Sequence, residues 1–286
     1  MIPAAFDYVR AGSIDQALDL IARPGAKALA GGQSLLPLMK LRLARPETLV
    51  DIGRIEELRG VRQLPDGRLA VGALTTYAEL MDSPARHYGL LRDALPDIGD
   101  VQVRNLGTVG GAIAHCDPAS DLPACLLALD AEIVIRSKRG ERSSTCNGFF
   151  HGAFVTDLAP DELVTEIRLP QGRDDAGSAY VSLTQPASGY SMVGVAAIVF
   201  RSSGASAIEG ASVALTGVHE HPYRAPEVEA ALVGTDGSAD AIRAAAEHAT
   251  VGVEVSSDIH ADAAYRTAMA KVYTARAIER ALSRLD

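Results

Sequence analysis

The chain has 286 residues, of which 48% are hydrophobic, so it can bury a sizeable core and is long enough for more than one domain. Its formal net charge is −9 and no run of Lys or Arg occurs, which argues against a nucleic-acid partner. The longest apolar run, residues 192–200, is about half as long as a membrane-spanning helix requires. The N-terminus lacks the basic residues and long apolar core of a signal peptide, so we expect no membrane span and a cytoplasmic location.

Residues 1–60 are expected to form a small α/β lobe. Ser13 followed by Gln16 is a capping-box pattern, and the apolar residues after Ser13 recur at helical spacing. This combination predicts a helix over residues 14–21. The other elements expected in this lobe are strands at 27–30 and 48–52 and a helix at 35–43.

A second lobe is expected over residues 61–172. Pro65-Asp66-Gly67 predicts a turn between two strands, and Lys138-Arg139-Gly140 predicts a hairpin. Asp121 stands where a helix would begin, in the place of a natural N-cap. The elements expected in this lobe are strands at 59–64, 68–73, 132–137 and 141–145 and helices at 76–81, 83–98 and 122–129.

The polar, glycine-rich segment 170–177 shows no periodicity and predicts a domain boundary. Beyond it we expect a C-terminal domain over 178–286, in which helices cover a sheet. The strands expected there lie at 180–184, 193–200 and 211–217, and the helices at 226–233, 239–250 and 262–284. In the last helix the spacing predicts a shared face for Tyr265, Met269, Val272, Ala275, Ile278 and Leu282, with Arg266, Arg276, Glu279 and Arg280 pointing elsewhere.

Two glycine-rich segments carry the strongest chemical signal. The first is Ala30-Gly31-Gly32-Gln33-Ser34, and the second runs from residue 105 to 123 and includes Thr108 and the pair Gly110-Gly111. Glycines allow tight turns with bare backbone N–H groups, which commonly hold phosphates, so the two segments suggest two arms that grip one diphosphate. Neither a G-x-G-x-x-G nor a P-loop pattern occurs, which disfavours both standard nucleotide sites. Ordinary turns between elements are the alternative interpretation.

The cysteines and histidines do not suggest a metal or catalytic site. Cys116, Cys125 and Cys146 are odd in number and too widely spaced for zinc or iron–sulfur ligation, so we expect free, buried thiols and no metal site in this chain. The seven histidines are scattered, and only His115 lies next to the second arm. No serine-hydrolase or zinc-protease motif occurs, so no residue is assigned a catalytic role.

Segments spread over the whole chain resemble the FAD-binding medium subunit of the molybdenum hydroxylase (xanthine oxidase) superfamily. Within that superfamily the chain is most similar to the carbon monoxide dehydrogenase medium-subunit group. The two segments that resemble its FAD-binding motifs are AGGQSLLPLMKLRL at 30–43 and NLGTVGGAIAHCDPASDLPACLLALDA at 105–131. Further matching segments are IPAAFDYVRAGSIDQALDL at 2–20, LVDIGRI at 49–55, VGALTTYAEL at 71–80, DELVTEIRLP at 161–170, VALTGV at 213–218 and DIHADAAYRTAMAKVYTARAIERAL at 258–282.

The resemblance implies an α+β fold, with a two-lobed FAD-binding domain of the vanillyl-alcohol-oxidase/CO-dehydrogenase flavoprotein type and a C-terminal domain of sheet and helices. It also implies the residues of the FAD site. Those expected along the pyrophosphate are Ala30, Gly31, Gly32, Gln33 and Ser34 in the first arm and Thr108, Val109, Gly110, Gly111 and Ala112 in the second. Asp117 and Asp121 are expected near the ribityl chain, Leu35 and Leu163 are further cofactor-binding residues, and Tyr190 is expected to pack near the isoalloxazine.

The chain departs from the family pattern at two positions. Ala112 stands where the family commonly has Asn after the glycine pair, which removes one side-chain amide but no backbone N–H. Gly189 stands where family members often place an Asp before the aromatic residue, which here is Tyr190. A half-buried core tyrosine is therefore the alternative interpretation of Tyr190.

The resemblance implies an electron-transfer subunit of a heterotrimeric molybdenum hydroxylase. Electrons would reach its FAD from [2Fe-2S] clusters on a small subunit, after leaving the substrate at a molybdopterin cofactor on a large subunit, and would then pass to an external acceptor. A dimer of heterotrimers is the expected assembly; the substrate and the acceptor stay open. Two alternatives are a self-contained FAD-dependent oxidoreductase acting on a small organic substrate and a non-redox nucleotide-binding module. We expect a bulky residue at Gly110 or Gly111 to abolish flavin retention while leaving the fold soluble.

Overall fold

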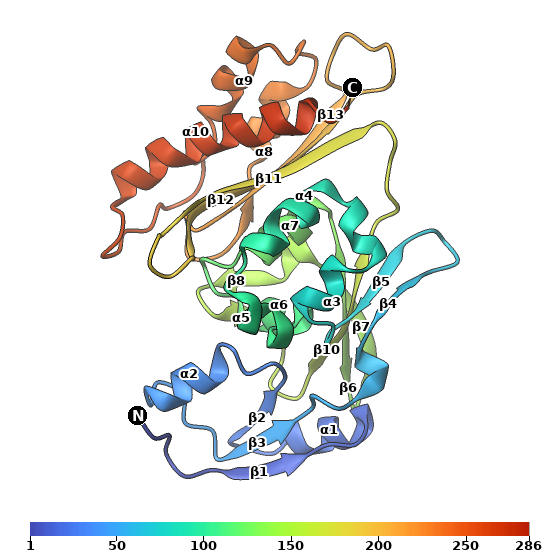
Figure 1. Cartoon of the computed structure of the whole chain (residues 1–286), viewed down its shortest axis with the longest axis vertical. Helices are drawn as coiled ribbons and strands as arrows, with labels where there is room; N and C mark the ends of the chain where they lie inside the picture. Colours follow the sequence, from blue (N-terminus) through green and yellow to red (C-terminus); the bar gives the residue numbers. More distant parts are fainter. Residues whose placement is uncertain (286) are drawn as a thin grey trace.

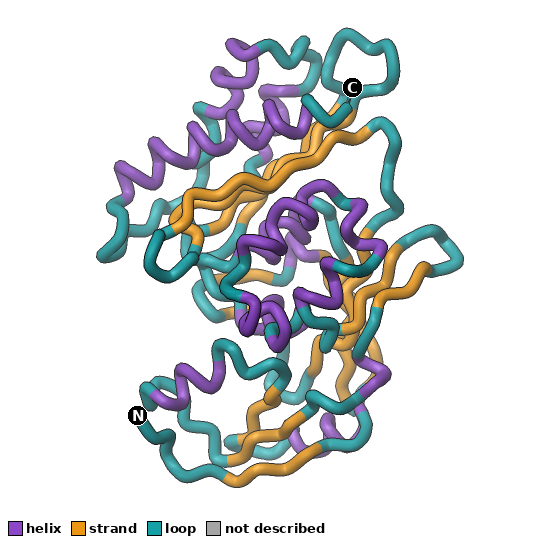
Figure 2. The backbone as a smooth tube through the Cα atoms, viewed as in Figure 1, coloured by secondary structure: helices purple, strands orange, loops and turns teal. Residues whose placement is uncertain are grey.

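The computed structural model describes residues 1–285, which build three larger sheets stacked along the long axis of the molecule and one small two-stranded sheet (Figures 1 and 2). In Figure 1 the N-terminal lobe lies at the bottom in blue, the middle lobe in cyan and green, and the C-terminal part at the top in yellow, orange and red. Within residues 1–285, no helix is both long and apolar enough to cross a bilayer.

The N-terminal lobe contains a three-stranded parallel sheet. Its order is β1 (Asp7–Arg10), β3 (Thr48–Asp51) and β2 (Ala26–Leu29), with α1 (Ile14–Ile21) and α2 (Leu35–Lys40) in the connections. Ser13 caps α1 as expected by accepting a hydrogen bond from the Gln16 N–H, but the Gln16 side chain bonds the N–H of Gly12 instead of completing the capping box. The helix predicted at 35–43 ends at Lys40, because Arg42 has a left-handed backbone conformation with φ of 60°.

The middle lobe is a five-stranded antiparallel sheet with short helices on one face. The strand order is β4 (Val61–Gln63), β5 (Leu69–Gly72), β10 (Leu163–Leu169), β6 (Glu132–Ser137) and β7 (Gly140–Thr145). The α-helices of this lobe are α3 (Tyr77–Met81), α4 (Gly89–Ala94), α5 (Val101–Leu106), α6 (Val109–His115) and α7 (Asp121–Ala128). The remaining elements are the 3-10 turns η1 (Glu56–Leu58), η2 (Pro84–His87), η3 (Leu95–Asp97) and η4 (Cys146–Gly148) and the small hairpin β8 (Phe150–Gly152) with β9 (Val155–Thr156).

Two expectations for this lobe need correction. The single helix predicted at 83–98 is divided into η2, α4 and η3, because Tyr88 has an extended backbone and Pro96 lies in the first turn of η3, which begins at Leu95. Two helices were not predicted at the second glycine arm: α5 ends at the start of the arm, and α6 lies within it. Asp100 caps α5 and Thr108 caps α6, each by accepting the N–H three residues on, and Gly107 joins the two helices.

The C-terminal part is a four-stranded antiparallel sheet with helices on both faces. The strands, in order, are β11 (Ala176–Thr184), β12 (Ser191–Phe200), β13 (Gly210–Thr216) and β14 (Tyr223–Arg224). Its own helices, α8 (Pro226–Leu232), α9 (Ala239–Ala246) and α10 (Ala263–Leu282), cover one face, and α4 and α7 of the middle lobe lie against the other (Figure 1). The sheet therefore shares a hydrophobic core with the middle lobe, to which it contributes Tyr180, Ala196, Ile198 and Ala214.

The buried face of α10 differs from the face predicted from spacing. Ile278 and Leu282 are buried as expected, but Tyr265 is 45% exposed and Arg266, expected to point away, is only 4% exposed. The other buried residues of the helix are small: Ala270, Thr274, Ala277 and Ala281. Small side chains let the helix lie close to β11 and β12, so close packing selects this face over the more apolar one.

Candidate functional site

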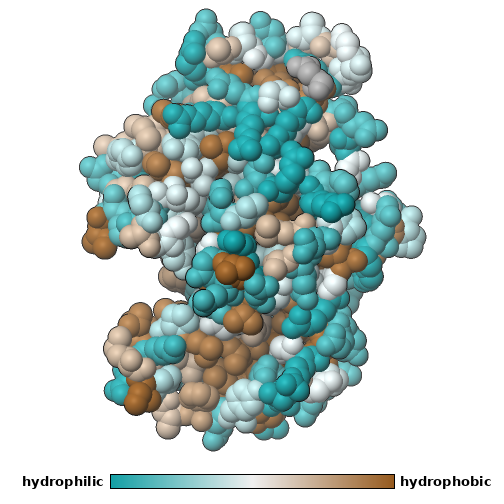
Figure 3. Space-filling view, viewed as in Figure 1, coloured by the Kyte–Doolittle hydropathy of each residue, from teal (hydrophilic) through white to brown (hydrophobic). Residues whose placement is uncertain are grey.

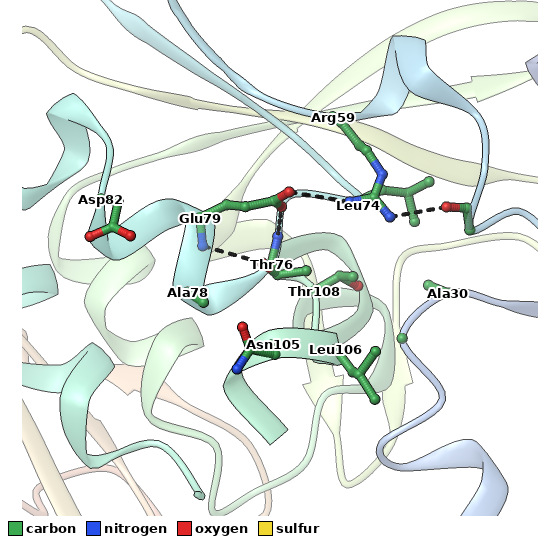
Figure 4. A pocket seen from close by; sticks show the side chains of 12 residues that line it. Ala30, Arg59, Leu74, Thr76, Ala78, Glu79, Asp82, Asn105, Leu106 and Thr108 are labelled. Atoms are coloured by element: carbon green, nitrogen blue, oxygen red, sulfur yellow. Dashed lines mark hydrogen bonds and ion pairs between the residues drawn. The ribbon is translucent and has the colours of Figure 1, made fainter. Parts of the chain in front are cut away.

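A cavity of about 460 Å³ lies between the N-terminal and middle lobes (Figure 4). It is lined by Ala30, Gly31, Gly53, Arg59, Leu74, Thr76, Ala78, Glu79, Asp82, Asn105, Leu106 and Thr108. Both predicted glycine arms therefore reach one cavity, through Ala30 and Gly31 on one side and Thr108 on the other. Figure 3 shows hydrophobic residues gathered on the N-terminal lobe beside the hollow that separates it from the middle lobe.

The first arm presents a row of free backbone donors. The N–H groups of residues 31–35 have no hydrogen-bond acceptor within residues 1–285. Gly32 has φ of 73°, a left-handed conformation that glycine adopts readily, and its position lets the chain turn from β2 into α2. Successive unpaired N–H groups in a turn form a concave site for an anion, so this loop fits the diphosphate role predicted for Ala30, Gly31, Gly32, Gln33, Ser34 and Leu35.

The second arm uses most of its backbone donors within the protein. The N–H of Val109 donates to the Thr75 carbonyl at 3.0 Å and that of Gly110 to the Ala73 carbonyl at 2.8 Å. The N–H of Gly111 donates to the Thr108 hydroxyl at 3.2 Å, and that of Ala112 donates to the Thr108 carbonyl. Among residues 108–112 only the N–H of Thr108 lacks an acceptor within residues 1–285. The first arm therefore offers most of the free backbone N–H groups, and the second arm offers mainly a surface of suitable shape for a ligand.

The cavity is also lined by polar residues that were not among the predicted site residues. Arg59 donates to the Gly53 carbonyl at 3.0 Å and forms an ion pair with Glu79 at 3.3 Å (Figure 4). Glu79 and Thr76 form a complete capping box at the start of α3. The T-x-x-E spacing of Thr76 and Glu79 was a readable signal for this cap. Nothing local in the sequence indicated that Arg59 and Asn105 reach the same cavity.

Asp117 and Tyr190 lie close together outside the core. Asp117 accepts the N–H of Ala119 at 2.9 Å, and its carboxylate lies 4.0 Å from the His115 ring nitrogen. Tyr190 is 54% exposed in the loop between β11 and β12, so the alternative interpretation as a core tyrosine is wrong. Partial burial, together with the negative charge of Asp117, raises the pKa of Tyr190. The exposed ring remains available for the predicted contact with an isoalloxazine.

Asp121 and Leu163 point away from the cavity. Asp121 is the first residue of α7, and Ser120 occupies the N-cap, so the predicted capping role is wrong. Asp121 as a whole is 7% exposed. Its carboxylate accepts hydrogen bonds from the Tyr180 and Ser191 hydroxyls, and burial raises its pKa. The Leu163 side chain is 6% exposed and packs in the core of the N-terminal lobe. Their predicted contacts with FAD remain predictions.

Cys116, Cys125 and Cys146 are free and buried, as predicted, and burial raises the pKa of each thiol. His115 packs against Phe154 with ring centroids 4.9 Å apart, and burial lowers its pKa against the opposing effect of Asp117. Among residues 1–285, no three His, Cys, Asp or Glu side chains gather as metal ligands. The arrangement offers an anion-binding loop and an exposed aromatic ring, which suit a bound redox cofactor.

Comparison with known proteins agrees with this arrangement. A family described as the FAD binding domain in molybdopterin dehydrogenase matches residues 4–172, and the CO dehydrogenase flavoprotein C-terminal domain matches residues 178–281. The carbon monoxide dehydrogenase medium chain of Hydrogenophaga pseudoflava is 39% identical over 288 residues, with 99% of both chains covered. The glyceraldehyde dehydrogenase medium chain of Sulfolobus acidocaldarius is 38% identical, with 98% of this chain and 99% of the relative covered.

Solved structures of similar proteins match this chain in both fold and length. A chain of carbon monoxide dehydrogenase from Hydrogenophaga pseudoflava superposes with a TM-score of 0.95 at 40% identity, over 99% of each chain. A chain of quinoline 2-oxidoreductase from Pseudomonas putida 86 superposes with a TM-score of 0.92 at 32% identity, again over 99% of each chain. The matches run through both domains and both glycine arms. The chain therefore belongs to the FAD-binding medium subunits of the carbon monoxide dehydrogenase-type molybdenum hydroxylases.

Proposed function

We propose that this chain carries the flavin stage of electron transfer in a molybdenum hydroxylase. In this role it links the [2Fe-2S] clusters of a small partner subunit to an external electron acceptor, and a large partner subunit holds the molybdopterin cofactor. FAD, when bound, supplies a ring that accepts and releases electrons. The work of this chain is to bind the cofactor, orient it and leave its ring accessible to both electron partners.

The row of free N–H groups at residues 31–35 is the observation that carries this proposal. Five successive donors on one loop match the several oxygens of a diphosphate, which carry delocalised negative charge. Backbone donors need no particular side chain, so Ala112 in place of Asn leaves this part of the site intact. In this proposal residues 1–60 and 61–172 form the two walls of the cofactor site, and residues 178–285 supply Tyr190 at the isoalloxazine end.

The small number of reactive side chains supports an electron-transfer role. The cavity is lined by one arginine, two carboxylates, one asparagine and threonines, and Arg59 and Glu79 are already paired with each other. This set offers no nucleophile activated by a neighbouring base. Substrate chemistry is therefore assigned to the large partner subunit, and the full assembly is proposed to be a dimer of heterotrimers.

A flavin titration tests the proposal. The chain is purified alone and together with its partner subunits, and FAD, FMN and ADP are added separately while binding is followed by the visible spectrum, or by calorimetry for ADP. We expect one FAD per chain, retained through a desalting column, with FMN and ADP bound more weakly because each lacks part of the dinucleotide. Binding in the complex but not in the chain alone would show that the partners complete the site.

Two results would contradict the proposal. A preference for ADP or ATP over FAD would indicate a nucleotide-binding module. Reduction of the bound flavin by a small organic substrate, in the absence of the large and small subunits, would indicate a self-contained oxidoreductase.

A further inference from the structure

Arg266, in the first turn of α10, is a buried cation that makes three hydrogen bonds outside its own helix. One guanidinium nitrogen donates to the Met192 carbonyl at 2.6 Å and to the Gly217 carbonyl. The other donates to the Asp258 carboxylate at 2.5 Å, which balances the charge. The planar, forked arginine head suits such a set of fixed acceptors better than a flexible lysine ammonium.

The two carbonyls belong to neighbouring strand ends of the C-terminal sheet. Met192 stands at the start of β12, two residues after Tyr190, and Gly217 directly follows the end of β13. Gly217 has φ of 76°, and a Cβ on it would lie 2.6 Å from the Ser191 carbonyl oxygen and 2.7 Å from that of Met192. The two backbones approach too closely here for any side chain, and Arg266 holds both of them.

The same strand ends hold the turn at residues 117–121. The N–H of Gly217 donates to the Pro118 carbonyl at 2.8 Å, and the Thr216 hydroxyl donates to the carbonyls of Pro118 and Ser120. The Ser191 hydroxyl donates to the Asp121 carboxylate at 2.5 Å. Arg266 is therefore connected to this turn, which includes Asp117, through hydrogen bonds to the start of β12 and the end of β13.

Tyr190 lies in a loop that is closed by its own hydrogen bonds. The Gln185 N–H donates to the Tyr190 carbonyl at 2.8 Å, and the Gly189 N–H donates to the Gln185 carbonyl at 2.8 Å. The Gln185 side chain also accepts hydrogen bonds from the N–H groups of Ala187 and Ser188. Because the loop is closed by these bonds, the position of the Tyr190 backbone depends on the base of the loop, where Arg266 binds the Met192 carbonyl. Figure 1 shows this loop beside the N-terminal end of α10.

We propose that Arg266 is a positioning residue for the flavin, which fixes Tyr190 and the 117–121 turn relative to each other by clamping the ends of β12 and β13. The inference rests on the proposed function, because it takes Tyr190 and Asp117 to flank the isoalloxazine end of FAD. Arg266 itself does not line the cavity. Its loss therefore changes how the flavin is held without removing any contact to it.

Arg284 offers a matched control from the same end of the chain. It donates to the Ser178 carbonyl at 2.5 Å and binds the Asp93 carboxylate at 2.7 and 2.8 Å, so it too joins a backbone carbonyl and a carboxylate. Its contacts lie at the start of β11 and on α4, away from the loop that bears Tyr190. A general loss of stability is therefore expected for both arginines, whereas an effect on the flavin is expected only for Arg266.

The test compares Arg266→Met, Arg266→Lys and Arg284→Met in the chain co-purified with its partner subunits. Hydrogen exchange of residues 185–192 and 117–121 is measured after FAD has been removed, and FAD affinity and the visible circular dichroism of the flavin are measured after it has been restored. We expect Arg266→Met to speed exchange in both segments, to alter the flavin dichroism and to weaken FAD binding about tenfold, because Tyr190 and the 117–121 turn are no longer fixed relative to each other. Arg266→Lys should show a smaller change of the same kind. Arg284→Met should leave exchange in residues 185–192 and the flavin signal unchanged; residues 117–121 are not part of this control, because Asp93 accepts the N–H of Tyr180, whose hydroxyl binds Asp121.

Wild-type exchange in both segments and wild-type dichroism in Arg266→Met would overturn the inference. So would equal flavin effects in Arg266→Met and Arg284→Met, which would indicate general destabilisation. If Arg266→Met does not fold, the exchange and dichroism of Arg266→Lys decide in the same way. Failure of the wild-type complex to hold FAD would instead contradict the proposed function, and the exchange measurement, which needs no flavin, would still test the clamp.

Discussion

Gly31 of the first arm lies directly against the Leu106 carbonyl at the end of α5. A Cβ on Gly31 would lie 2.7 Å from the Leu106 carbonyl carbon and closer still to its oxygen. The two arms are far apart in the sequence, and this contact sets their spacing. No side chain can stand at residue 31 without pushing the N-terminal lobe away from the middle lobe.

We predict that Gly31→Ala weakens FAD retention, because the added methyl group must separate the arms or displace the loop of free N–H groups. The overpacking should lower the free energy of unfolding by about 1–3 kcal/mol. FAD content after desalting and thermal unfolding measure the two effects. Gly172→Ala is the control, since a Cβ there meets no atom within 4 Å. Wild-type FAD retention in Gly31→Ala would contradict this account of the arm spacing.

Gly110→Ala should destabilise the fold itself. A Cβ on Gly110 would lie 2.5 Å from the Cβ of Ala73 and 2.9 Å from its carbonyl oxygen, and Gly110 is buried. Overpacking at such a site costs about 1–3 kcal/mol, so the melting temperature should fall. For a bulky residue at Gly110 we therefore expect a loss of stability, rather than the soluble, flavin-free variant predicted from the sequence.

Gly111→Ala should be milder and act through the cap of α6. A Cβ on Gly111 would lie 2.7 Å from the Thr108 hydroxyl oxygen, which must move and give up its hydrogen bond to the Gly111 N–H. Loss of an N-cap bond costs about 1 kcal/mol. In thermal unfolding, the melting temperature should be highest for the wild type, lower for Gly111→Ala and lowest for Gly110→Ala. The reverse order of the two variants would contradict the packing described.

The stability of the chain should depend on the ionisation of Asp121. Burial raises the pKa of this carboxyl above its ordinary value of 3.8. A raised folded-state pKa means that protonation favours the folded state, so this stability is fully present below 3.8 and is lost as pH rises through the folded-state pKa. In Asp121→Asn the group is always neutral, so the melting temperature of the variant minus that of the wild type should become more positive as pH rises.

Two measurements test this prediction. Thermal unfolding of the wild type and Asp121→Asn is recorded from acidic to mildly alkaline pH. A difference in melting temperature that does not change with pH would contradict the prediction. Asp121→Ala is the companion variant, because it leaves the Tyr180 and Ser191 hydroxyls without their acceptor. The free energy of unfolding of Asp121→Ala should fall by about 1–3 kcal/mol for each hydroxyl left without a hydrogen-bond partner.

The three thiols should be inert in the folded protein near neutral pH. Burial and the neighbouring Asp117 raise the pKa of Cys116 to about 11, and burial raises those of Cys125 and Cys146 as well. Modification requires an exposed thiolate, so thiol reagents should label none of the three before unfolding and all three in denaturant. Mass spectrometry counts the labels. Rapid labelling of any one cysteine in the native chain would show that its surroundings open locally.

Local sequence patterns determined much of this protein. The two glycine-rich segments carried the resemblance that identified the family, and they predicted a cofactor site, because a backbone that turns tightly needs glycine whatever surrounds it. Helix starts at Ser13 and Thr76 could be found because a cap is formed by residues a few positions apart. The cysteine spacing correctly indicated free thiols, because ligation and pairing require defined spacing.

Only the tertiary structure decided which groups remain free and which are used. The N–H groups of Val109 and Gly110 resemble those of the first arm in sequence, yet they bond carbonyls at residues 73–75, which folding brings beside them. Asp121 resembled a cap but accepts from hydroxyls on β11 and β12, and Arg266 resembled a surface charge but clamps two strand ends. Hydrogen-bond partners and burial depend on contacts between segments distant in the chain, and local spacing carries no information about those contacts.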